Sequence, residues 1–393
     1  MQRNTSMAER LIYFPAPTSD QTPFQTDTDV LTVSPPELRI RVIGVGGAGG
    51  NVINCLVKHR MAAIDTLAAN TDRQALSGGR AGGLICLGEN LTRGLGAGGN
   101  PEVGRHAAEE SLKALTAALR GADMVFIAAG MGGGTGTGAA PIVAEVAREL
   151  GALTVALVTR PFSFEGRRRA RTAEEGLEAL RAVADTVIVV PNDRLLQVAG
   201  RSTTVRESFS MADAVLRHGV QGIADLVTNH GLINVDFADV RAIMSEAGPA
   251  LLGIGSAQGA DRAVEAARRA MACPLLEGRL EGASRLLLHV SGNEDLGLFE
   301  VQRVAEMVAR TIDPDANIIL GATIDPTLSN GSVKVTLVAT GFSLQESVPL
   351  AQPYAIPSRI NQVKPRPAPA EPVSIREQDA LDIPPFLKRF RQA

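Results

Sequence analysis

The chain has 393 residues, of which 45% are hydrophobic, and it is long enough to bury more than one large core. A formal net charge of -3 gives no reason to expect nucleic acid as a partner. No apolar run reaches the length of a membrane span and no signal-like segment opens the chain, which predicts a soluble cytoplasmic protein without direct membrane insertion. Cys55, Cys86 and Cys273 lie far apart outside any C-x-x-C pattern, so we expect buried thiols rather than disulfides or metal ligands.

Residues 1–36 are rich in Thr, Ser, Asp, Gln and Pro and lack periodicity, which predicts a disordered N-terminal extension. From there to residue 202, short apolar runs alternate with amphipathic segments of helical length. The runs cover residues 40–45, 64–69, 124–129, 153–158 and 187–190. Such alternation is typical of a parallel sheet with helices on both faces, and residues 37–202 are therefore predicted to form one nucleotide-binding α/β domain.

A long central helix is predicted over residues 203–230. Its apolar residues are spaced as one buried stripe, made of Phe209, Val215, Leu216, Val220, Ile223 and Leu226. Residues 231–341 are predicted to form a second, C-terminal α/β domain. The expected helices cover residues 236–247, 261–271 and 298–310, and the expected strands cover residues 251–256, 286–290, 317–324 and 332–340.

The C-terminal part of the chain changes in composition. Residues 342–380 are rich in Pro, Gln, Ser and Arg, which predicts a disordered linker. Residues 381–393, LDIPPFLKRFRQA, restore apolar anchors beside basic residues. Isolated anchors after a linker are typical of a peptide that docks on a partner, and a merely sticky, disordered end is the alternative.

A glycine-rich run at residues 130–138, GMGGGTGTG, follows one predicted strand and leads into a predicted helix. Glycines let backbone N–H groups converge on an anion at the positive end of a helix, and Thr135 and Thr137 add hydroxyl donors. The run therefore predicts a phosphate cradle rather than a flexible turn. No lysine lies in it and the chain has no G-x-x-x-x-G-K-[ST] pattern, so binding would depend on backbone and hydroxyl donors.

The sequence GGGTGTG at residues 132–138 is the tubulin signature, and over residues 37–341 the chain resembles the bacterial cell-division GTPases of the tubulin/FtsZ family. The resemblance implies a tubulin-like α/β fold, in which a parallel-sheet GTP-binding domain is joined by a long central helix to a second α/β domain. It also implies GTP or GDP and Mg²⁺ as cofactors. The resemblance assigns nucleotide contacts in this run to Gly132, Gly133, Gly134, Thr135, Gly136 and Thr137.

Residues 44–51, GVGGAGGN, satisfy G-x-G-x-x-G after the first predicted strand. This pattern equally fits an NAD-binding dehydrogenase, with Asp72 as the carboxylate that binds the ribose. A dehydrogenase needs no second phosphate cradle, and none of the five histidines lies in a recognisable acid-base setting, so we favour the GTPase. The resemblance assigns nucleotide contacts here to Gly46, Gly47, Asn51, Asn70 and Thr71.

Three more segments carry candidate contacts. The loop 94–101, GLGAGGNP, is either a plain surface loop or, by resemblance, a loop that closes over the terminal phosphate. The segment 159–169, TRPFSFEGRRR, follows a strand, and its arginine run would ordinarily be a solvated helix face. Asn192 ends another strand. By resemblance, the nucleotide-binding residues of these segments are Gly96, Ala97, Gly98, Pro161, Glu165 (for the ribose), Arg169 and Asn192 (for the base).

Phe209 and Asp213 are four residues apart and hence share one face of the central helix. Phe209 alone would more often be a core residue. A carboxylate within reach of the ring suggests base recognition, because Asp213 can accept hydrogen bonds from guanine N1–H and the 2-amino group, an edge that adenine lacks. The resemblance implies the same two roles.

The segment 234–239, NVDFAD, opens a predicted helix. Asp236 and Asp239 are residues that a helix N-terminus prefers, so simple capping is a strong alternative to catalysis. The resemblance implies that Asn234, Asp236 and Asp239 enter the nucleotide site of the next subunit in a head-to-tail polymer. There the aspartates would polarise the attacking water.

The resemblance implies a GTPase that assembles protofilaments of the bacterial division ring at mid-cell and hydrolyses GTP at the subunit interface. By resemblance, the C-terminal peptide would bind membrane tethers and other division proteins. One alternative is a nucleotide-binding structural or regulatory paralogue of the same family, and a remote one is the dehydrogenase.

Overall fold

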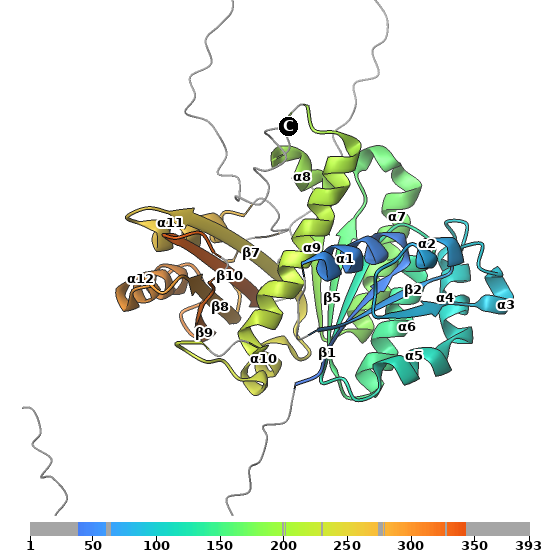
Figure 1. The fold of residues 1–393 in the computed structure, drawn as a ribbon, viewed down its shortest axis with the longest axis horizontal. Coiled ribbons are helices and arrows are strands. Elements are labelled where there is room, and N and C mark those ends of the chain that lie inside the picture. The colour runs from blue at the N-terminus through green and yellow to red at the C-terminus, as the bar shows by residue number, and fades with distance from the viewer. Residues whose placement is uncertain are drawn as a thin grey trace, which may run out of the picture. The chain divides into compact units, whose positions relative to one another are not determined.

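The computed structural model of the protein describes residues 38–59, 64–198, 200, 202–228, 231–273, 278, 280–326 and 328–342. The predicted N-terminal extension, most of the predicted linker and the C-terminal peptide lie outside these residues. The described elements build around a ten-stranded sheet with the order β3-β2-β1-β4-β5-β6-β7-β10-β8-β9. The N-terminal and C-terminal halves of this sheet lie on either side of the long helix α9 (Figure 1).

The first six strands are all parallel, as their continuous apolar runs predict. They are β1 (Ile40–Val45), β2 (Ile64–Asn70), β3 (Gly83–Cys86), β4 (Met124–Gly130), β5 (Leu153–Arg160) and β6 (Thr186–Pro191). In β4 every residue except Gly130 is buried, because helices cover both faces of the sheet. The strand order reverses between β1 and β4, the point where ligands bind at the carboxyl edge of such sheets.

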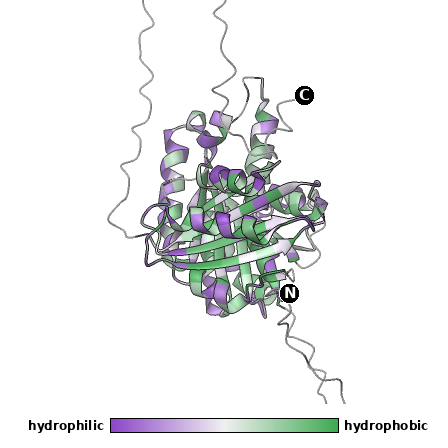
Figure 2. Ribbon diagram, turned by 90° about the vertical axis from the view of Figure 1, so that its left-hand side faces the viewer, coloured by the Kyte–Doolittle hydropathy of each residue, from purple (hydrophilic) through white to green (hydrophobic). Residues whose placement is uncertain are grey.

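Helices form one layer on each face of this parallel sheet. One core joins the sheet to α1 (Gly46–Lys58) and α9 (Val205–Thr228). A second core joins its other face to α4 (Pro101–Glu110), α5 (Leu112–Leu119), α6 (Thr135–Glu149) and α7 (Arg167–Val183). Short helices complete the loops at α2 (Arg73–Ser77), α3 (Glu89–Thr92), η2 (Ser163–Glu165) and α8 (Asn192–Val198). In Figure 2 the strands are mostly green (hydrophobic), whereas the helices carry both purple and green stretches, as helices with one buried face do.

The C-terminal half continues the same sheet. Its elements are α10 (Phe237–Met244), β7 (Gly248–Gln258), α11 (Arg262–Met271), β8 (Arg285–Gly292), α12 (Leu298–Ala309), β9 (Asn317–Ile324) and β10 (Ser332–Thr340). Strand β7 pairs in parallel with β6 over only three residue pairs, from Thr186–Gly248 to Ile188–Ala250, and antiparallel with β10. A third core packs α11 and α12 onto this half of the sheet. The predicted α/β class is confirmed, whereas the domain boundaries stay a prediction.

Some sequence predictions are wrong in detail. Phe209, predicted in the buried stripe of the central helix, is 40% exposed, although the other five residues of the stripe are buried. Its ring is exposed because it faces the pocket described below rather than a core. Cys55 and Cys86 are only partly buried, and Cys273 alone of the three cysteines is buried. Strand β3 and the four short helices were not predicted at all.

Candidate functional site

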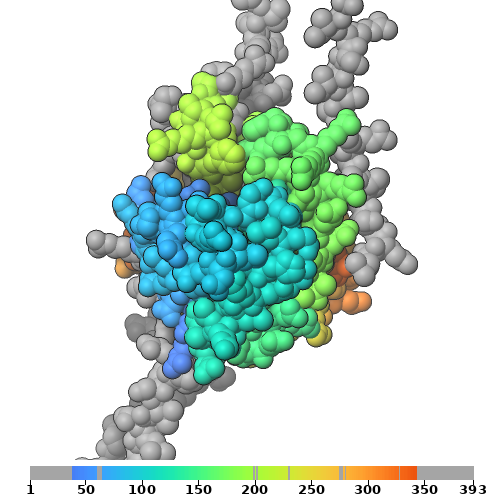
Figure 3. Space-filling view, turned by 90° about the vertical axis from the view of Figure 1, so that its right-hand side faces the viewer, coloured from blue at the N-terminus to red at the C-terminus, as the bar shows by residue number. Residues whose placement is uncertain are grey.

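A pocket lies at the carboxyl edge of the parallel sheet, between the first turn of α7 and the N-terminal half of α9. In Figure 3 the starts of α7 (green) and α9 (yellow-green) stand side by side above the blue N-terminal segments. The pocket is lined by Ala48, Gly130, Met131, Thr159, Pro161, Glu165, Arg169, Asn192, Phe209, Ala212, Asp213 and Leu216. Six of these were predicted nucleotide contacts: Pro161, Glu165, Arg169, Asn192, Phe209 and Asp213. The fold therefore gathers lining residues from five separate sequence segments at one place.

The helix α9 supplies an aromatic ring and a carboxylate on one face. Phe209 packs edge-on against the buried ring of Phe162, with 5.4 Å between the ring centroids. Its free face can stack on a flat ligand. Asp213 lies one turn further along the helix, and burial raises the pKa of its carboxyl from 3.8 to about 7. A buried carboxylate of this kind favours a ligand that donates hydrogen bonds to it.

Other residues that line the pocket are polar. Glu165 accepts a hydrogen bond from the Phe162 backbone N–H at 2.8 Å and forms an ion pair with Arg169 at 3.1 Å. Asn192 is only 4% exposed, and its Oδ1 has no hydrogen-bond partner among the described residues. A buried amide oxygen without a hydrogen-bond donor is costly, so a donor on a ligand would stabilise it.

The glycine run forms the start of α6. The first helical hydrogen bond runs from Gly138 N–H to the Gly134 carbonyl, so the backbone N–H groups of residues 133–137 precede it and are available to an anion. The threonine hydroxyls brace the turn: Thr137 Oγ1 accepts from Gly132 N–H at 2.8 Å, and Thr135 Oγ1 lies 2.6 Å from Thr71 Oγ1. This is the geometry of a phosphate cradle.

The other glycine loops meet this cradle. A Cβ atom on Gly46 would lie 3.0 Å from the Gly136 nitrogen, and one on Gly134 would lie 2.9 Å from Ala97 Cβ. Gly96 N–H donates to the Thr71 carbonyl at 3.1 Å, which ties the loop at residues 94–100 to the end of β2. A Cβ atom on any of three predicted contact residues would meet nothing within 4 Å, namely Gly47, Gly98 and Gly133. Their backbones therefore border open space, which leaves room for the close approach of a ligand.

The three predicted catalytic residues lie elsewhere. Asn234, Asp236 and Asp239 follow the far end of α9, and the helix rises about 22 Å between Asp213 and Thr228 alone. Asp236 Oδ1 caps α10 by accepting from Asp239 N–H at 2.8 Å, and Asn234 Oδ1 accepts from Gly231 N–H at 2.6 Å. The side chains of all three residues are exposed. Capping by Asp236 is therefore real, but it leaves the Asp239 carboxylate on the surface.

Comparison with known proteins identifies the family. Residues 39–200 match the GTPase domain of the tubulin/FtsZ family, and residues 248–343 match the C-terminal domain of the FtsZ family. An FtsZ dimer structure from M. jannaschii is 48% identical, with a TM-score of 0.74 over 77% of this chain and 88% of that one. The chain belongs to the tubulin/FtsZ family.

Two further solved structures are similar to this chain. A mutant of the M. jannaschii FtsZ is 47% identical, with a TM-score of 0.75 over 78% of this chain and 92% of that one. CetZ2 from Haloferax volcanii, described as a GTPγS-bound protofilament, is 23% identical with a TM-score of 0.67 over 79% of this chain and 95% of that one, a likeness of fold. The tubulin/FtsZ GTPase domain binds GTP or GDP, and the dehydrogenase alternative is therefore wrong. Asp72, which it required at a ribose, instead caps α2 by accepting from Gln74 and Ala75 N–H.

Sequence reasoning missed part of the pocket. Ala48, Met131, Ala212 and Leu216 line it and were not predicted as contacts. Leu216 and Ala212 share a helix face with Phe209 and Asp213, so helical spacing alone carried a usable signal for them. Conversely, Asn51 was predicted but lies exposed on α1 outside the lining residues. Within the described segments, no three His, Cys, Asp or Glu side chains are grouped to hold a metal ion, and no helix is long and apolar enough to cross a bilayer.

Proposed function

We propose that this tubulin/FtsZ family protein assembles head to tail into protofilaments of the bacterial division ring and hydrolyses GTP where two subunits meet. The observation that carries the proposal is the separation of its two half-sites. The pocket lies along the N-terminal half of α9, and the cradle directly follows Gly130 and Met131 of its lining, whereas Asp239 lies beyond the other end of α9. One chain therefore cannot bring Asp239 to its own nucleotide, and a second copy stacked along α9 can.

The ends of the molecule carry apolar residues suited to such stacking. Leu95 and Phe164 are exposed beside the glycine loop and the pocket. At the other end Leu232 and Ile324 are exposed, and the bridge between Ile233 and Ala322 holds their two segments together. Apolar residues that gather at both ends favour contact between unlike faces of two copies, and such a heterologous contact builds an open filament.

The residues on the nucleotide side suit guanine and phosphates. Phe209 would stack on the base, Asp213 would accept from N1–H and the 2-amino group, and the Asn192 amide would complete the base contacts. The N–H groups at the start of α6 and the hydroxyls of Thr135 and Thr137 would hold the phosphates.

The chemistry needs positioning and charge stabilisation more than covalent catalysis. The open backbone at Gly47 and Gly133 leaves room for a nucleotide with Mg²⁺, and the ion would neutralise phosphate charge when bound. The Asp236 and Asp239 carboxylates of the adjoining copy would orient and polarise the attacking water. The predicted tail peptide would recruit membrane tethers and other division proteins at mid-cell.

The test is sedimentation of the full-length chain with GTP and with GDP, with phosphate release followed across protein concentrations. Assembly with GTP, and phosphate release per subunit that falls steeply below the assembly threshold, are expected. Constant specific activity down to monomeric concentrations would contradict catalysis between subunits. Nucleotide binding without assembly or turnover would favour the structural or regulatory paralogue instead.

A further inference from the structure

The first turn of α12 exposes two large apolar side chains. Leu298 is 74% exposed and Phe299 is 78% exposed, so neither contributes to the core. Isolated exposed apolar residues are ordinary, but two adjacent ones on the first turn of a helix form a small patch. Folding alone gives no reason for this patch.

The patch lies near the end of the molecule that carries Asp239. Strand β8 ends at Gly292, which pairs with Ile324 of β9, and the loop 293–297 then leads directly into α12. Ile324 is itself exposed, and the bridge between Ile233 and Ala322 joins β9 to the segment that precedes Asp236. The apolar patch is thus continuous in structure with the loop that would enter a neighbouring subunit.

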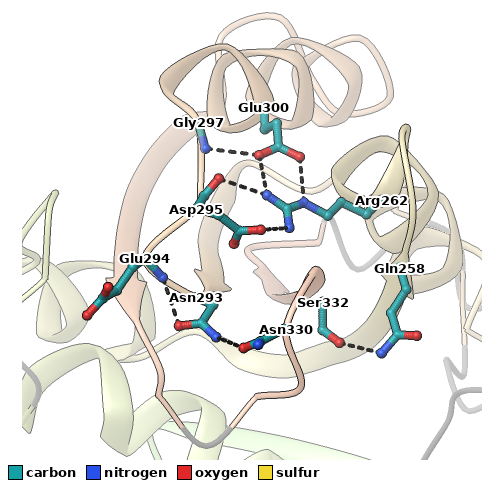
Figure 4. Close-up of polar contacts among 9 residues, drawn as sticks. All are labelled: Gln258, Arg262, Asn293, Glu294, Asp295, Gly297, Glu300, Asn330 and Ser332. Carbon is teal, nitrogen blue, oxygen red and sulfur yellow. Dashed lines mark hydrogen bonds and ion pairs between the residues drawn. The ribbon is translucent and has the colours of Figure 1, made fainter.

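A buried arginine holds the first turn of α12 in its position. Arg262, the first residue of α11, is only 8% exposed. Its Nε and Nη2 donate to the two carboxylate oxygens of Glu300 at 2.8 and 3.0 Å, and its Nη1 donates to Asp295 Oδ2 at 2.6 Å. Nη2 also donates to the Asp295 carbonyl at 2.9 Å, and Glu300 Oε2 accepts from Gly297 N–H at 2.9 Å. Figure 4 shows Arg262 between the loop and the helix, in contact with both.

The contacts of Arg262 fix geometry more than they add stability. A buried ion pair gains little net free energy, because the loss of hydration offsets the attraction. A bidentate arginine and carboxylate pair is instead directional and holds its partners in one arrangement. Here the partners are the loop at Asp295 and the first turn of α12 at Glu300, which carries Phe299 one residue earlier. The hydrogen bond of the Arg262 side chain lowers the pKa of Glu300, which keeps that partner ionised at neutral pH.

We propose that Arg262 is a positioning residue for subunit assembly, which holds Leu298 and Phe299 as an apolar contact for a second copy of this chain. The inference rests on the proposed head-to-tail assembly and adds a part of the interface to it. A second copy is the favoured occupant for two reasons. The patch adjoins the loop that would enter the neighbour's site, and the pocket end of the chain offers exposed apolar partners at Leu95, Phe164 and Leu196.

The experiment compares full-length Arg262→Met, Phe299→Ala and the double variant by the critical concentration for GTP-dependent sedimentation. Each single change should raise the critical concentration about tenfold, equivalent to about 1.4 kcal/mol per contact. The double variant should be less impaired than the product of the two single effects, because Arg262 acts through the turn that carries Phe299. GTP affinity of the monomer should not change in any of them, since the pocket is remote from this turn.

Arg303→Met is the matched control. Arg303 lies on the same helix but is exposed and pairs with the exposed Asp261 at 3.3 Å, so its loss should leave the critical concentration unchanged. If Arg262→Met does not fold, Glu300→Gln makes the same test with a milder change. Multiplicative effects in the double variant, or a normal critical concentration for Phe299→Ala, would overturn the inference. Failure of the unaltered chain to assemble would instead overturn the proposed function.

Discussion

At the scale of single residues, Asp213 shows the strongest conflict between stability and binding. Its carboxyl is largely buried in the pocket, and burial raises its pKa from 3.8 to about 7. When folding raises the pKa of a group, the protonated group contributes its full stabilisation at pH values below the pKa of the unfolded state. This contribution is lost as the pH rises through the pKa of the folded state. Because of this residue, the nucleotide-free protein should become less stable as the pH rises from 4 to 8.

Asp213→Asn should separate the two effects. At pH 8 the free energy of unfolding of the nucleotide-free variant should exceed that of the unaltered protein by at most about 4 kcal/mol. The difference should shrink as the pH approaches 4. Thermal unfolding across this pH range measures it. Equal stability of the two proteins at pH 8 would contradict a raised pKa at Asp213.

The same residue predicts base selectivity. Asp213→Ala should weaken GTP binding far more than any residual ATP binding, because a site built to accept from the guanine edge discriminates strongly. GTP affinity of the unaltered protein should also fall as the pH drops below about 7, since protonation removes the acceptor. Competition binding with GTP and ATP at pH 6 and pH 8 tests both. Equal affinity for the two nucleotides would exclude base recognition by Asp213.

At the scale of elements, the cradle depends on how closely α4 approaches α6. A Cβ atom on Gly138 would lie 2.0 Å from the Pro101 carbonyl oxygen, so these helices touch through backbone. Gly138→Ala should push α4 away, and with it the loop 94–100. We expect it to destabilise the protein by about 1–3 kcal/mol and to weaken GTP binding as well.

Gly133→Ala is the comparison for that change. The same added methyl at Gly133 meets no atom within 4 Å and should leave the unfolding midpoint unchanged, yet it should weaken GTP binding if a phosphate approaches this backbone. Chemical denaturation and nucleotide titration of both variants measure the two effects separately. Normal GTP affinity in Gly133→Ala would mean that phosphate lies elsewhere.

The elements also show why sequence predicts some features and not others. Strands β4 and β5 are easily predicted from the sequence, because both of their faces are buried and nearly every residue is apolar. Strand β3 has four residues at the sheet edge, one of them the exposed Leu84, and leaves no such pattern. The continuity of the sheet rests on three residue pairs between β6 and β7, a tertiary contact with no local signature. Phe209 was misjudged as buried because helical spacing cannot tell a core from a pocket.

At the scale of the whole molecule, the predicted tail and the folded core should act independently. Deleting residues 381–393 should leave GTP hydrolysis and assembly nearly intact and abolish recruitment to membrane tethers, because a solvated linker separates the peptide from the core. Co-sedimentation of filaments with a candidate tether, with and without the peptide, is the measurement. Loss of assembly in the truncated chain would show that the peptide belongs to the fold or the filament contact.

The whole-molecule prediction that decides the mechanism is complementation between two defective chains. Asp239→Ala keeps its own pocket and cradle, so it should bind GTP and assemble but turn over poorly, since it presents a defective loop to its neighbour. Asp213→Ala has the opposite defect, with an intact loop and an impaired pocket. In mixed filaments an intact loop meets an intact pocket at some contacts, so phosphate release by the mixture should exceed the sum of the two variants alone. Phosphate release measured for each variant and for mixtures at constant total protein tests this. The control is Asp239→Ala alone at the total protein concentration of the mixtures. Normal turnover by Asp239→Ala alone would mean that Asp239 has only a structural role in the first turn of α10, and it would contradict catalysis between subunits.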